Sequence, residues 1–85
     1  LRELVRVRRF ADDWLMLGLC LMHEGKTDEA VAALKQAIAI WPYRALAHGK
    51  LAECYQLLGD AVRARDYRER AEWLARYLES ASTPK

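Results

Sequence analysis

The 85-residue chain has few of the residues that fill β-strands, because valine, isoleucine and threonine together occupy only eight positions. Alanine, leucine and arginine account for 37 residues instead, and these residue types favour helices. Apolar residues make up 53% and charged residues 31% of the chain, a balance that excludes disordered and collagen-like classes. The composition therefore predicts one small all-α domain.

Long apolar runs are also missing. The longest, Leu15 to Met22, has eight residues and contains Gly18, whereas a membrane span needs about 18. The first ten residues alternate arginines with apolar residues and lack the apolar centre of a signal peptide. We therefore expect a chain without a membrane span, located in the cytoplasm.

Residues that carry chemistry are scarce. Cys20 and Cys54 are too few for a disulfide framework, and we expect both to be buried free thiols. His23 and His48 match no metal-ligand spacing and have no nucleophile or carboxylate at a catalytic spacing. All four glycines are isolated, which excludes a glycine-rich phosphate loop. The sequence therefore predicts no enzyme, no metal and no cofactor.

Charge is nearly balanced, with a formal net charge of +2. The arginines form two groups, at residues 2–9 and 63–76, and the second group alternates with acidic residues at spacings that allow ion pairs along a helix. We interpret both groups as solvated faces. The alternative is an electrostatic surface for nucleic acid or an acidic partner.

Capping and breaking residues divide the chain into helices. Gly25 and Gly59 follow two predicted helix ends, and Pro42 stops a third helix. The expected N-terminal residues of helices are Asp12 and Asp13, Thr27, and Asp60. The predicted helices cover approximately residues 1–9, 13–23, 27–41, 44–58 and 61–79, and residues 80–85 are expected to form a frayed tail.

A repeat of 34 residues underlies this pattern. Shifting the sequence by 34 gives seven identities, namely Ala11/Ala45, Leu17/Leu51, Cys20/Cys54, Gly25/Gly59, Ala30/Ala64, Ala37/Ala71 and Tyr43/Tyr77. Most of them are small or apolar residues at predicted helix crossings and turns. Each unit is therefore expected to be one helix-turn-helix.

The first unit carries a specific motif, made of Trp14-x-x-Leu17-Gly18-x-x-Leu21 followed by Gly25, Ala30, Leu34, Ala37 and Pro42. It resembles the tetratricopeptide repeat signature. A weaker second copy lies in the same register, with His48, Leu51, Ala52, Tyr55, Gly59, Ala64 and Ala71. The resemblance covers residues 11–78 and implies antiparallel helix pairs stacked as a short right-handed α-solenoid.

The second copy departs from this family where a terminal repeat would. His48 replaces the usual tryptophan, Arg68 an aromatic residue and Arg76 the usual proline. We therefore expect the last helix to continue past residue 76 and to cap the array with a polar outer face. Its apolar stripe is expected to comprise Val62, Ala64, Tyr67, Ala71, Leu74 and Leu78.

The predicted organisation is a single domain over residues 1–85. Residues 1–10 form an N-terminal helical segment, in register with the end of a preceding second helix. The first repeat covers residues 11–44 and the second 45–78, with its helix extended to about residue 80 and a tail at 81–85.

The resemblance implies a protein-interaction module whose first helices line a concave groove for a partner peptide. The expected groove residues are Leu15, Met16, Leu19 and Met22 in the first repeat and Lys50, Glu53 and Gln56 in the second, with Asp12, His23, Leu46, Gly49 and Leu57 beside them. Trp14, Leu17, Gly18 and Leu21 are assigned to the face that packs on the second helix.

The apolar residues left over on the first-repeat face suggest a homo-oligomer formed through that face. Two alternatives remain open. One is a mildly basic nucleic-acid-associated domain, and the other is a purely structural cap of a longer repeat array.

Overall fold

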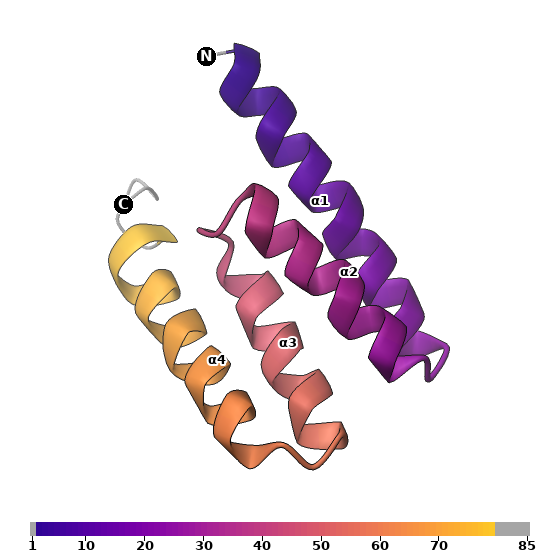
Figure 1. The fold of residues 1–85 in the computed structure, drawn as a ribbon. Coiled ribbons are helices and arrows are strands. Elements are labelled where there is room, and N and C mark those ends of the chain that lie inside the picture. Colours follow the sequence, from indigo (N-terminus) through magenta and orange to yellow (C-terminus); the bar gives the residue numbers. More distant parts are fainter. Residues whose placement is uncertain (1, 80–85) are drawn as a thin grey trace.

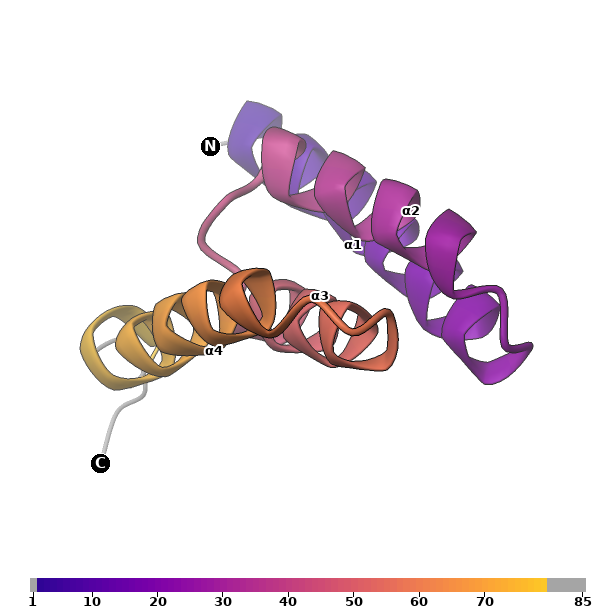
Figure 2. The ribbon, with the colours of Figure 1, turned by 60° about the horizontal axis from the view of Figure 1, so that its bottom comes forward.

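The computed structural model describes residues 2–79, and side chains within residues 5–78. It contains α1 (Arg2–His23), α2 (Thr27–Ile40), α3 (Ala45–Leu57) and α4 (Ala61–Leu74), and a π-helical turn, η1 (Ala75–Glu79), continues α4. Consecutive helices are antiparallel (Figure 1), and the α1–α2 pair lies against the α3–α4 pair (Figure 2). The fold is therefore the predicted all-α helical repeat, and the expected tail at 80–85 lies outside the described residues.

The turns within the two pairs have the predicted chemistry. Gly25 and Gly59 have φ angles of 80° and 82°, a left-handed conformation that disfavours side chains. Asp60 caps α4, because its Oδ1 accepts a hydrogen bond of 3.1 Å from the Arg63 amide. Thr27 does not cap α2 as expected. The Lys26 carbonyl accepts the bond from the Ala30 amide, so Thr27 is already the first helical residue.

The largest difference from expectation is the length of α1. A break was predicted before Asp13, with residues 1–9 as a separate helix, but α1 is continuous for 22 residues from Arg2. Asp12 and Asp13 therefore lie inside a helix and not at its N-terminus. No proline or glycine occurs at residues 2–11 to end a helix there. As a result, α1 projects beyond the end of α2 (Figure 1).

The core lies where the two helix pairs meet. Leu34, Leu51 and Cys54 are its largest fully buried side chains. Small residues allow the helices to approach closely, because a Cβ placed on Gly18 would lie only 2.7 Å from Leu34 Cγ. The close crossing of α1 and α2 thus depends on Gly18.

The apolar stripe predicted for the last helix is only partly buried. Ala64 and Leu74 are buried, and Tyr67 packs on the core with its ring stacked on Tyr55, 5.6 Å between centroids. Val62 and Leu78 remain 65% and 40% exposed, contrary to expectation. They lie near the two ends of the α4–η1 segment, where α3 offers less surface to cover them.

Candidate functional site

The residues expected to line a groove lie on α1 and α3, two helices that touch each other in addition to their partners within each pair. We call this surface the α1–α3 face and define it by Met16, Leu19 and Met22 on α1 and by Leu46, Lys50, Glu53 and Leu57 on α3. Met16, Leu46 and Leu57 are 58%, 48% and 72% exposed. Leu19 and Met22 are half-buried and pack against the core.

Leu15 is buried, contrary to its assignment as an exposed groove residue. It is only 5% exposed and belongs to the core cluster that includes Ala37 and Ala47. Trp14 and Leu17, expected to be buried against the second helix, are 37% and 45% exposed. Leu15 lies where α2 and α3 both approach α1, beside Ala37 of α2 and Ala47 of α3, so a prediction based on α2 alone leaves it exposed.

The polar groove residues of α3 separate into two groups. The Lys50 ammonium lies 3.0 Å from a Glu53 carboxylate oxygen, one helical turn away, and this ion pair lies within the α1–α3 face. Gln56 is exposed but turns toward α4, since its Oε1 accepts a bond of 3.4 Å from Arg68. Gln56 thus marks the edge of the surface and not its centre.

An ion pair closes one end of the α1–α3 face. Arg44 Nη2, at the N-cap of α3, lies 2.7 Å from each carboxylate oxygen of Asp12 in α1. The two side chains are 33% and 43% exposed, so solvent screens the interaction. Asp12 was expected at a helix terminus, and no local pattern indicates this link, because it joins residues 32 positions apart.

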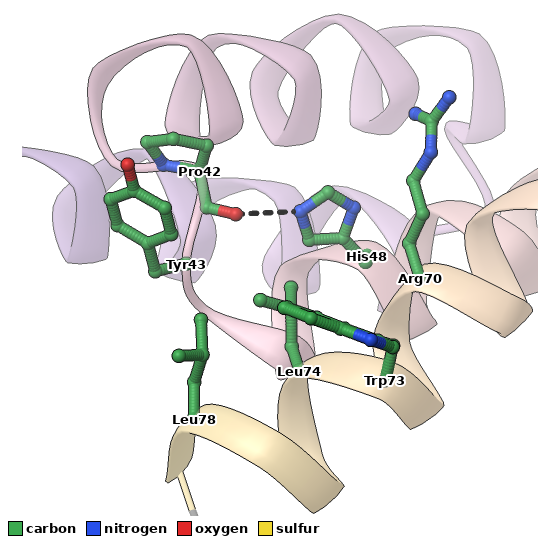
Figure 3. Close-up of a pocket in the computed structure, with 7 residues that line it drawn as sticks. All are labelled: Pro42, Tyr43, His48, Arg70, Trp73, Leu74 and Leu78. Atoms are coloured by element: carbon green, nitrogen blue, oxygen red, sulfur yellow. Dashed lines mark hydrogen bonds between the residues drawn. The ribbon is translucent and has the colours of Figure 1, made fainter.

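A second surface feature, not predicted, is an apolar cavity of ≈ 470 Å³ between the α2–α3 connection and α4 (Figure 3). Its lining residues are Pro42, Tyr43, His48, Arg70, Trp73, Leu74 and Leu78. His48 replaces the tryptophan of the sequence motif, and it packs as expected, with 5% exposure and its ring 5.9 Å from that of Tyr67.

The imidazole of His48 is held in one tautomer. Its Nε2 donates to the Pro42 carbonyl at 2.9 Å, since a carbonyl oxygen can only accept. Nδ1 is buried and has no hydrogen-bond partner among the described residues. Burial lowers the pKa of His48, and the positive charge of Arg70 lowers it further against the opposing effect of the Pro42 bond. The ring is held in place by its hydrogen bond to Pro42 and by its contact with the Tyr67 ring.

The two thiols differ, although both were expected to be buried. Cys54 is fully buried, whereas Cys20 is exposed on α1, and the structure leaves both unbridged. Burial raises the pKa of the Cys54 thiol, Glu53 raises it further, and Lys50 partly opposes them. Within residues 2–79, no group of three or more histidine, cysteine or acidic side chains could hold a metal ion.

The arginines of α4 interact mainly with neighbouring side chains. Arg63 lies 3.0 Å from an Asp60 oxygen, and the guanidinium of Arg70 lies 5.0 Å from the Tyr67 ring centroid. Arg65 and Glu69 are 4.0 Å apart. This face is the partly paired, solvated surface that the sequence predicts. Over the described part of the chain, no helix is long and apolar enough to cross a bilayer.

Comparison with protein families supports the interpretation of the repeat. The sequence model described as "Tetratricopeptide repeat" matches residues 21–71, which is more than half of the chain. Comparison with curated proteins gave no match. Repeats of this family act in general as protein-protein interaction modules. With four α-helices among residues 2–79, arranged as two antiparallel pairs in a 34-residue register, the chain belongs to the tetratricopeptide repeat family.

Proposed function

We propose that this chain is a non-catalytic interaction module that binds a peptide segment of a partner protein on the α1–α3 face. The observation that carries the proposal is the exposure of Met16, Leu46 and Leu57 beside half-buried Leu19 and Met22. Exposed apolar side chains grouped on two neighbouring helices are typical of docking surfaces.

The chemistry of this face favours a peptide with apolar anchor residues. Leucine and methionine side chains offer flexible apolar contacts and no strong hydrogen bonds. The Lys50–Glu53 pair places both signs of charge within the face, so neither an acidic nor a basic peptide is favoured over its full length. We therefore expect a segment with two or three large apolar residues, bound as a helix or in extended form.

The test is selection of peptides from a random display library on the immobilised chain, followed by binding measurements on the selected peptides. Leu57→Glu should weaken binding at least about tenfold, because a charge would replace an apolar contact. Val62→Glu is the matched control, since Val62 is 65% exposed but lies on α4, and it should leave affinity unchanged.

Three outcomes would contradict the proposal. Peptides whose binding is insensitive to Leu57→Glu but lost in Trp73→Ala would assign binding to the cavity beside His48. Selection of no peptide at all would favour the purely structural cap. Nucleic acid bound with an affinity that falls steeply with salt would favour the arginine-rich surface.

A further inference from the structure

The side of α1 that faces away from α3 carries exposed apolar residues. Phe10, Trp14 and Leu17 are 64%, 37% and 45% exposed. Together with Leu21, which is half-buried and packs against the core at the edge of this face, they recur every three or four residues, which aligns them along one side of the helix. We call these four residues the outer face of α1. Its two aromatic side chains alone expose roughly 200 Å².

The outer face and the α1–α3 face are separate surfaces. Leu15 and Leu19 lie on the other side of α1, and of the four outer-face residues Leu21 alone also packs against the core. About 150° of helix rotation separates the mean direction of these two leucines from that of the outer face. A molecule covering the outer face therefore leaves the α1–α3 face accessible.

The 34-residue register argues against a helix pair stacked before α1 as the occupant of the outer face. In the 34-residue register, the turn between the pairs, at residues 41–44, corresponds to residues 7–10. A preceding pair stacked in register would need the chain to turn there. These residues are helical, Pro42 has Arg8 as its counterpart, and α1 continues straight through them (Figure 1).

Charge along α1 is arranged for an antiparallel neighbour of the same kind. Residues 5–10 contain three arginines and no acid, whereas Glu24 directly follows α1 at its other end. The Glu24 carboxylate is 55% exposed and lies 3.4 Å from the Lys26 ammonium of its own chain, a surface pair that a stronger partner can replace. Arg6 and Glu24 are 18 residues apart, which is five helical turns, so both border the outer face along the same edge. The helical turn extends to Glu24, whose amide bonds to the Cys20 carbonyl at 3.0 Å.

We propose that the outer face of α1 binds the same face of a second copy of this chain, with the two helices antiparallel about a two-fold axis near residue 15. In this arrangement Phe10 meets Leu21 of the partner subunit, and Trp14 meets Leu17 of the partner subunit. Arg6 then lies against Glu24 of the partner subunit. The midpoint between the two residue numbers is almost the same in all three pairings, within about one residue. A single two-fold axis can therefore relate all of them, as an isologous interface requires.

The interface is small, and this sets its expected strength. Stable dimers bury about 800 Å² of surface on each subunit. A contact between two α1 helices that rests on four apolar side chains is expected to bury less than this. We therefore expect a dimer with a dissociation constant in the micromolar range.

Sedimentation equilibrium across micromolar concentrations, under reducing conditions that exclude a Cys20 crosslink, tests the apolar part. The chain should shift from monomer to dimer with concentration. Phe10→Glu should weaken dimerisation at least about tenfold, and Leu57→Glu, at a comparably exposed residue of the α1–α3 face, should not. Circular dichroism confirms that each variant is folded. A chain that stays monomeric throughout, or a Leu57→Glu effect equal to that of Phe10→Glu, overturns the proposal.

Charge reversal tests the antiparallel register. Arg6→Glu and Glu24→Arg should each weaken the homodimer several-fold, since each creates two like-charge contacts. Mixing the two single variants should restore dimerisation as a heterodimer, because both contacts then pair opposite charges. Arg65→Glu on α4 is the control and should leave the dimer unchanged. If the mixture dimerises no better than either variant alone, the proposed arrangement is wrong.

The two experiments also separate this dimer from peptide binding. Phe10→Glu should retain the peptide affinity measured for the α1–α3 face, and Leu57→Glu should retain the dimer. Either surface can therefore fail its test without affecting the other.

Discussion

The close crossing of α1 and α2 at Gly18 gives a prediction whose magnitude follows from the geometry. In Gly18→Ala, the new Cβ would lie 2.7 Å from Leu34 Cγ and 2.8 Å from Leu34 Cδ2. Leu34 is 0% exposed, so its side chain has no free space to move into. The helices must therefore separate or Leu34 must adopt a poorer rotamer, which costs about 1–3 kcal/mol.

Replacing glycine by alanine inside a helix also gains about 1 kcal/mol of helix propensity, which must be removed from the comparison. Gly49 in α3 provides the control, because a Cβ there would lie 3.8 Å from Ala71 Cβ, an ordinary contact. Gly49→Ala should stabilise the chain by about 1 kcal/mol or less. The difference between the two variants isolates the clash and should be about 1–3 kcal/mol.

Urea denaturation followed by far-ultraviolet circular dichroism measures both free energies of unfolding. In thermal melts, each 1 kcal/mol corresponds to a shift of about 4–8 °C for a chain of this length. Equal effects of the two substitutions, or a Gly18→Ala variant more stable than Gly49→Ala, would refute the argument that α1 and α2 are too close at Gly18 for a side chain.

Three further measurements test side chains described above. Burial holds the pKa of His48 in the folded chain below its ordinary value of 6.5. As the pH falls, His48 therefore becomes protonated in the unfolded chain before it does in the folded chain. The free energy of unfolding should be at its full value above pH 6.5 and should decrease as the pH falls below it. His48→Phe should remove that component in pH-dependent melts, and His23→Gln should not. Cys20 should react quickly with an alkylating reagent in the folded chain and Cys54 only after unfolding, whereas equal rates would contradict the assigned burial. Asp12→Asn should lower the free energy of unfolding by about 0.5–1 kcal/mol at low salt, with a smaller loss at high salt.

The sequence was sufficient for features that depend on local chemistry. Gly25 and Gly59 predicted the turns because only their backbone adopts the left-handed conformation without strain. Ala30 and Ala37, which recur as Ala64 and Ala71, were expected at helix crossings, and both are buried. Both the turn glycines and the recurring alanines could be identified from the residue types and their spacing in the sequence.

Features that depend on distant partners were missed. The burial of Leu15 depends on α2 and α3 together, and an apolar residue in a helix pattern does not indicate which neighbouring helices will cover it. The Asp12–Arg44 pair joins residues that only the fold brings together. The continuity of α1, by contrast, could have been inferred, because the position matching Pro42 one repeat earlier is Arg8, which does not break a helix.

The Asp12–Arg44 pair has a consequence for folding cooperativity. Packing is denser within the α1–α2 and α3–α4 pairs than between them, so each pair resembles a unit coupled to its neighbour by a limited interface. The ion pair adds a link between α1 and the start of α3 to that interface. A chain lacking it would couple the two pairs less tightly, and amide hydrogens of either pair would exchange faster through openings that leave the other pair folded.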